Sequence, residues 1–196
     1  MVHEGLGLIR LTAESAARRC VITPGHEVVV SGELTGGESP SVWVHQGFGL
    51  TGRVEGGRVP LTGENLTPGL GRVAGLWDGF GITPARPTSV IHDHDAPPVV
   101  LTASERLPGP QDLTDTERES AMDEVFSRSG SRLLGFGGTS HSTFACLLFV
   151  DSAFVDWWLD VTTLRIDLSV AMLPSSLWDD SGRLPPGVMP GAHARP

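Results

Sequence analysis

The residue pattern with the most defined chemistry is a pair of histidines two positions apart. His92 and His94 are followed directly by Asp95. In an extended strand, residues i and i+2 project from the same face, so both imidazoles can ligate one transition metal while Asp95 completes the shell. His26 and His45 lie in the same half of the chain and are the natural further ligands. One interpretation is therefore a metal-dependent enzyme or a small-molecule-binding protein that uses His92 and His94.

The same segment also fits a polar loop. The metallo-hydrolase pattern H-x-H-x-D-H would place its acid and its third histidine where this chain has Ala96 and Pro97. The glutamate of a cupin pattern would fall where the chain has Pro98 and Val99. We therefore favour a loop and expect no cofactor, with a transition metal at the His92, His94 and Asp95 group as the alternative.

Two further groups resemble nucleophilic sites but lack their geometry. Ser140 precedes His141, and neighbouring residues of an extended strand point to opposite sides, so they cannot form a direct nucleophile–base pair. The nucleophile-elbow pattern G-x-S-x-G also fails, because position 142 is Ser. Cys146 lies in an apolar run, where a thiol packs and does not react. No catalytic residue can be named from these patterns.

Acidic residues gather in one segment that is also a predicted helix. Residues 112–124 contain six acidic side chains, and Arg118 is the only basic residue among them. They fit either a solvated helix face, favoured near a helix N-terminus by the dipole, or a docking strip for a basic partner. The docking interpretation gives three candidate interaction residues in this segment, and we add Trp178, which we expect to be exposed or to face a partner because it precedes an acidic, Pro-rich tail. These four are Glu117, Glu119, Asp123 and Trp178.

The composition excludes several classes of protein. All 14 basic residues are Arg, and the chain has neither Lys nor Tyr, a bias typical of a GC-rich bacterial genome. P-loop phosphate binding, protein-kinase catalysis and pyridoxal chemistry each need a Lys. The net charge is −9 with an isoelectric point near 5.1, and the Arg residues are scattered. This distribution disfavours nucleic acids and anionic membranes as partners and is compatible with a basic protein partner or a homo-oligomer.

The two cysteines and the N-terminal residues indicate in which cellular compartment the protein is expected. Cys20 and Cys146 are 126 positions apart and form no C-x-x-C motif. The chain shows no basic segment followed by an apolar stretch at its start, and its longest apolar run, 144–150, is too short to span a bilayer. We expect a cytoplasmic protein whose two thiols are reduced.

The first 106 residues are predicted to form a β-rich region. Short β-branched segments are separated by turn residues about every ten positions, which is typical of a sandwich or small barrel. Residues 51–62 are nearly symmetric about Gly56-Gly57 and predict a hairpin, with Pro60 on an edge strand. A short helix is expected over 11–19, and the expected strands are 26–31, 41–45, 71–77, 88–92 and 99–102.

Residues 107–178 are predicted to add one or two helices and further strands to the same core. Thr114 and Glu117 match a capping box, and the helix that follows has an apolar face of Ala121, Met122, Val125 and Phe126. The remaining expected elements are a Ser/Gly-rich loop over 127–138, a doubly buried strand over 144–150, a helix in preference to a strand over 151–162, a half-buried strand over 164–172 and a Pro/Gly-rich tail over 179–196.

These observations predict a β-rich α+β fold: an antiparallel sandwich or small barrel with one or two helices. They favour a non-catalytic protein-interaction or assembly protein, such as an accessory subunit, a particle component or a neutralising partner of a basic protein. The alternative is the small-molecule-binding or metal-dependent protein built on His92 and His94.

Overall fold

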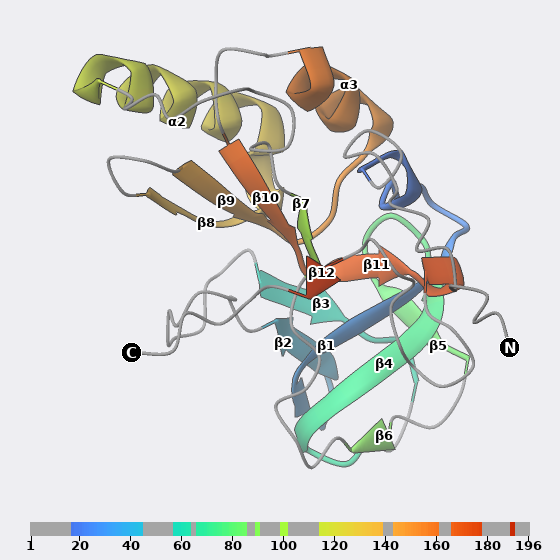
Figure 1. Cartoon of the computed structure of the whole chain (residues 1–196). Coiled ribbons are helices and arrows are strands. Elements are labelled where there is room, and N and C mark those ends of the chain that lie inside the picture. The colour runs from blue at the N-terminus through green and yellow to red at the C-terminus, as the bar shows by residue number, and fades with distance from the viewer. Residues whose placement is uncertain are drawn as a thin grey trace, which may run out of the picture.

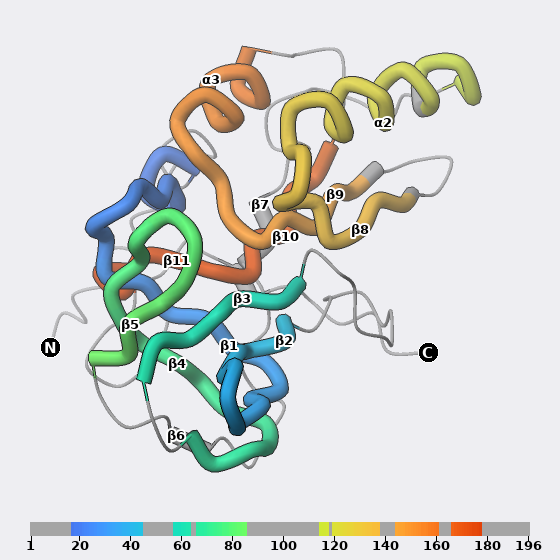
Figure 2. Tube along the Cα trace, turned by 180° about the vertical axis from the view of Figure 1, so that it is seen from behind, coloured from blue at the N-terminus to red at the C-terminus, as the bar shows by residue number. Residues whose placement is uncertain are grey.

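Two β-sheets lie face to face, and two helices cover the outer side of one of them (Figure 1). The computed structural model describes residues 17–44, 57–63, 66–85, 89–90, 99–101, 114–138, 143–160, 166–177 and 189–190. Seen from behind, α2 and α3 again lie above the sheet that contains β8, β9 and β10 (Figure 2). The described chain therefore has three layers, in the order helices, second sheet, first sheet.

All strand pairs of the first sheet are antiparallel, and all its strands but one come from the N-terminal half of the chain. Its main path runs β3-β2-β1-β4-β5, while β6 pairs with β4 and β11 pairs with β1. The path curls, so that Leu61, which directly follows β3, forms an isolated parallel bridge with Ile82 of β5. Its strands are β1 (Glu27–Thr35), β2 (Ser41–Val44), β3 (Arg58–Pro60), β4 (Gly69–Trp77), β5 (Ile82–Pro84), β6 (Ser89–Val90) and β11 (Met172–Pro174).

The second sheet has the order β12-β7-β10-β9-β8. The strands β9 and β10 are parallel, and α3 connects them, since a parallel pair needs a crossover that returns the chain to the same end of the sheet. Its elements are β7 (Val99–Leu101), α2 (Asp115–Ser129), β8 (Leu133–Gly138), β9 (Thr143–Leu147), α3 (Ser152–Asp160), β10 (Ile166–Val170) and β12 (Met189–Pro190), with short 3-10 turns η2 (Gly130–Arg132) and η3 (Ser175–Leu177).

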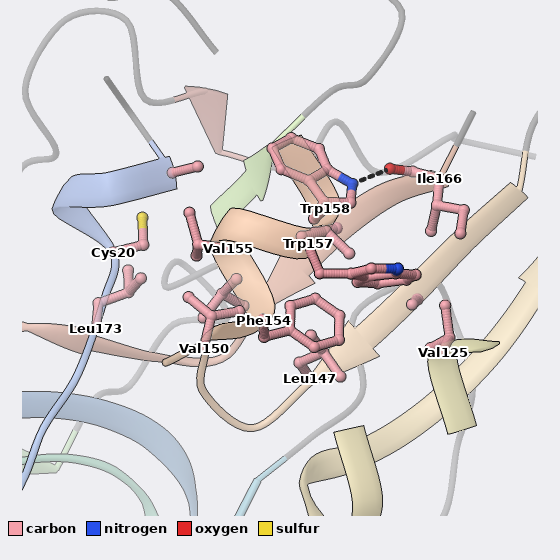
Figure 3. Packing of buried hydrophobic residues seen from close by; sticks show 14 of the residues in the cluster. Cys20, Val125, Leu147, Val150, Phe154, Val155, Trp157, Trp158, Ile166 and Leu173 are labelled. Atoms are coloured by element: carbon pink, nitrogen blue, oxygen red, sulfur yellow. Dashed lines mark hydrogen bonds between the residues drawn. The ribbon is translucent and has the colours of Figure 1, made fainter. Parts of the chain in front are cut away.

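Strand β9 separates two hydrophobic clusters, one on each face of the second sheet. Ala145 and Leu147 belong to the cluster under the helices, whereas Cys146 and Leu148 belong to the cluster between the sheets. Side chains of consecutive strand residues point to opposite faces, so a strand between two cores must be apolar at every position. Figure 3 shows the helix-side cluster, in which Phe154, Val155, Trp157 and Trp158 of α3 pack toward the sheet.

The predicted fold class is confirmed: the chain is a strand-rich α+β protein whose strand pairs are antiparallel except for β9 and β10, and no closed barrel is found in the described residues. Several elements are also confirmed, among them the Thr114–Glu117 capping box and the helical choice for α3. The buried strand predicted over 144–150 is present as β9, but it ends at Leu147. Only the second arm of the hairpin predicted over 51–62 lies in the described residues. There, β3 pairs with β2 and occupies the edge of the sheet path, as expected for a strand with Pro60.

Two predicted elements are wrong. Residues 127–138 are not one loop, because α2 continues to Ser129 and Leu133–Gly138 forms the edge strand β8. Residues 164–172 are not one half-buried strand: the chain bends at Ala171, so β10 pairs in the second sheet and β11 pairs in the first. Ser169 and Leu173, on opposite sides of this bend, are both buried, because each sheet is covered where this segment passes.

Candidate functional site

The surface of α2 carries most of the described candidate residues, and its N-terminus is fixed by local hydrogen bonds. The amide N–H of Glu117 donates to the Thr114 hydroxyl oxygen at 3.2 Å, and the amide N–H of Thr114 donates to the Glu117 carboxylate at 2.8 Å. Donation from the Thr114 amide and then from its hydroxyl lowers the pKa of Glu117. Although Glu117 is exposed, its carboxylate is occupied in starting the helix.

Glu119 and Asp123 have a different environment. Both are exposed and lie one helical turn apart on α2, and neither forms an ion pair within the part of the chain that the structure describes. Glu124, by contrast, is paired with Arg128 at 2.9 Å on the same helix. The carboxylates of Glu119 and Asp123 therefore have no hydrogen bond or ion pair among the described residues, whereas Glu117 keeps one oxygen free and stays a predicted contact.

An apolar side chain lies beside these two carboxylates. Ala121 and Val125 are buried against the sheet, but Phe126, assigned to the same apolar face from the sequence, is 52% exposed. The helix packs through a narrow stripe one residue wide in each turn, so Phe126 falls at its margin. Glu119, Met122, Asp123 and Phe126 follow the spacing i, i+3, i+4, i+7 and form one surface, which we name the α2 strip.

The C-terminal end of α2 is held by cationic side chains that contact aromatic rings. The guanidinium of Arg128 lies 5.0 Å from the ring centre of Trp157. The guanidinium of Arg132 lies over Phe149 and Phe154, at 5.5 and 5.8 Å, and pairs with Asp151. These cations are committed to packing α2 against α3, which leaves the α2 strip acidic.

The described tryptophans belong to the core more than to a surface. Trp43 is half-buried, and the other three, Trp77, Trp157 and Trp158, are buried. The indole N–H of Trp158 donates to the Ile166 carbonyl at 2.7 Å (Figure 3). Trp178, the tryptophan predicted to face a partner, lies outside the described residues and stays a prediction.

The two cysteines are free and buried, and they lie in different hydrophobic clusters. Burial raises the pKa of Cys20 to about 12 and that of Cys146 to about 11, with Ser169 acting in the opposite direction on Cys146. A thiol with so high a pKa is protonated at neutral pH and is not a nucleophile. The prediction that Cys146 serves packing is confirmed.

The metal hypothesis cannot be placed on the described residues, because His92, His94 and Asp95 all lie outside them. Within the described ranges, no three His, Cys, Asp or Glu side chains gather in a way that could hold a metal ion. His26, expected as a further ligand, lies at the surface, where its Nε2 is 3.2 Å from the Thr23 hydroxyl. The segment with Ser140 and His141 also lies outside the described residues.

A second exposed aromatic residue, which the sequence analysis missed, is Phe80 in the turn between β4 and β5. Its side chain is 77% exposed. The Asp78 carboxylate accepts the amide N–H groups of Gly81 at 2.7 Å and Phe80 at 2.8 Å, and these bonds lower its pKa. The signal that could have found this turn is the tetrapeptide Asp78-Gly-Phe-Gly81, since Asp and Gly are favoured in tight turns.

In a comparison with known proteins, no family model, no curated protein and no solved structure matches the chain. Neither described helix, α2 or α3, is long and apolar enough to cross a membrane. The functional argument therefore depends on the residues themselves.

Proposed function

We propose that this chain is a non-catalytic protein-interaction or assembly protein: an accessory subunit, a particle component or a neutralising partner of a basic protein. The observation that carries this proposal is the α2 strip, in which the half-exposed Phe126 lies beside Glu119 and Asp123. An aromatic anchor with adjacent carboxylates suits a partner that offers an apolar pocket and cationic side chains.

The charge of the chain supports a partner other than a second copy. At a net charge of −9, two copies repel each other, whereas a basic protein is attracted over a distance set by the ionic strength. The proposal includes a cytoplasmic location, supported by two buried cysteines that remain free.

The test is an affinity capture from a cell lysate with the wild-type chain and a triple variant, Glu119→Gln, Asp123→Asn and Phe126→Ala. We expect the wild type to recover one basic protein, with less recovered as salt is raised, and the triple variant to lose it. All three side chains are exposed, so the variant should keep the circular dichroism spectrum of the wild type.

A matched control carries the same kinds of change on other surfaces: Glu38→Gln, Asp160→Asn and Leu70→Ala, where all three residues are also exposed. This control should retain the partner. Equal recovery by the wild type and the triple variant would show that the α2 strip is not the interface.

A further inference from the structure

The turn between β4 and β5 presents an aromatic side chain in a fixed position outside the core. Phe80 is 77% exposed, and Leu76, at the end of β4, is 51% exposed. Leu76 is in register with Thr83 on one neighbouring strand and with Glu27 on the other, so it lies on the outer face of the first sheet. The turn therefore exposes two large apolar side chains within five residues.

The backbone that carries Phe80 is ordered before any partner arrives. Two amide N–H groups of the turn donate to the Asp78 carboxylate, and the amide N–H of Asp78 donates to the Gly81 carbonyl at 3.2 Å. At the base of the turn, the Trp77 amide donates to the His26 carbonyl and the Gly25 amide donates to the Trp77 carbonyl. A side chain on such a preorganised backbone loses less conformational entropy when it binds than one on a flexible loop.

The charges around this turn indicate what it would bind. Asp78 is the only charged residue between Leu76 and Thr83, and Glu27 adds a second carboxylate beside Leu76. The Glu27 carboxylate also accepts the hydroxyl of Ser175 at 3.1 Å, which holds it at this surface. Carboxylates next to apolar side chains are complementary to an apolar face flanked by cationic side chains and repel an anionic membrane.

We infer that the β4–β5 turn is a second docking surface, on which Phe80 and Leu76 pack against the apolar face of a basic amphipathic helix of a partner protein while Asp78 and Glu27 face its cationic side chains. In Figures 1 and 2 the turn lies next to β5 and apart from α2. The surface extends the proposed function to a second contact and does not depend on the α2 strip.

The test uses a defined probe, a 14-residue synthetic peptide with Arg and Leu at helical spacing, titrated into the full ¹⁵N-labelled chain. A second peptide of equal charge, with Ser in place of Leu, measures charge attraction alone. We expect the Arg/Leu peptide to shift the amide signals of residues 76–83 and to bind about tenfold more tightly than the Arg/Ser peptide.

Three variants separate the contributions of the turn. Phe80→Ala should weaken the binding measured at residues 76–83 by about tenfold, because it removes the anchor. Asp78→Asn keeps an acceptor oxygen and should reduce the salt dependence, whereas Asp78→Ala also loosens the turn and should weaken binding further. Leu70→Ala, on the same strand but outside the turn, is the matched control and should bind like the wild type.

Two results would overturn the inference. One is equal binding of both peptides with shifts spread over all exposed carboxylates. The other is binding to neutral phosphatidylcholine vesicles that Phe80→Ala abolishes, since this would make the turn a membrane anchor. Phe126→Ala is measured in parallel. If this variant loses the signal shifts at α2 but keeps those at residues 76–83, the α2 strip and the turn bind independently, and each proposal can fail without the other.

Discussion

Arg132 and Asp151 form an ion pair that joins the end of α2 to the start of α3. The Arg132 guanidinium also donates to the carbonyls of Arg128 at 2.7 Å and Ser129 at 3.0 Å, which lie in the last turn of α2. The other Asp151 oxygen accepts the amide N–H of Phe154 at 2.8 Å and so caps α3. One pair of side chains therefore satisfies backbone groups that both helices would otherwise leave without partners.

We predict that Arg132→Ala lowers the free energy of unfolding by about 3 kcal/mol, because it leaves Asp151 without its cation and removes a side chain that is only 17% exposed. Urea denaturation followed by tryptophan fluorescence measures this loss. The matched variant is Arg18→Ala, which removes the arginine of an exposed ion pair with Asp156 of α3. It should cost less than about 1 kcal/mol, and similar losses for both variants would contradict the special role of Arg132.

The neighbouring tryptophans of α3 should respond differently to replacement by Phe. Trp158→Phe removes an indole N–H that donates to the Ile166 carbonyl at a buried position, and we expect a loss of about 2 kcal/mol. Trp157→Phe removes the same ring volume but keeps an aromatic face for Arg128, so we expect less than half of that loss. Thermal unfolding of both variants checks this order, and a larger loss at Trp157 would contradict it.

Gly75 should not tolerate even a methyl group. A Cβ at this position would lie 2.2 Å from the Thr83 carbonyl oxygen, so β4 and β5 would have to move apart. We predict that Gly75→Ala costs about 3 kcal/mol, whereas Gly37→Ala, at a positive φ but with open space around it, costs about 1 kcal/mol. Urea denaturation measures both losses, and equal losses would show that β4 and β5 can move apart at little cost.

The Asp78 turn should make stability depend on acid pH. The folded pKa of this carboxyl lies below its usual value of 3.8, so the unfolded chain takes up the proton first as the pH falls. The contribution of Asp78 is thus complete above that value and is lost as the pH falls through the lowered folded pKa. We predict that the difference in urea midpoint between the wild type and Asp78→Asn shrinks below about pH 4.

Asp123→Asn is the control for this pH series, because Asp123 is exposed and forms no ion pair among the described residues. Its difference from the wild type should stay small across the same range. A constant difference for Asp78→Asn between about pH 2 and 5 would show that the amide hydrogen bonds of the turn do not favour the charged carboxylate.

The sequence allowed prediction of those elements whose signals are local. The capping box at Thr114 and Glu117 lies within four residues, and the unbroken apolar run before Val150 identifies a strand between two cores. The strand β8 was missed because Leu133–Gly138 is rich in glycine, and its pairing with β9 compensates for its low intrinsic β-propensity. The break at Ala171 was missed because the alternation of apolar residues continues through it and carries no sign that the chain changes sheets.

The candidate site was predictable in part for a similar reason. Helical spacing alone indicates that Glu119 and Asp123 lie near each other, and the structure shows both exposed. The exposure of Phe126 depends on how narrow the contact between α2 and the sheet is, which no local pattern encodes. The prominence of Phe80 depends on a turn that local residues suggest but that three neighbouring segments hold in place.

The bend at Ala171 has a practical consequence for anyone who maps partners by deletion. The segment 166–174 completes both sheets, since β10 lies between β7 and β9 while β11 covers Val28–Val30 of β1. A truncated fragment that ends near residue 106 would leave that edge of β1 bare and would separate β7 from β10. Such fragments are expected to bind other proteins nonspecifically through their exposed strand edges. Point substitutions in the intact chain are therefore the more reliable way to locate an interface.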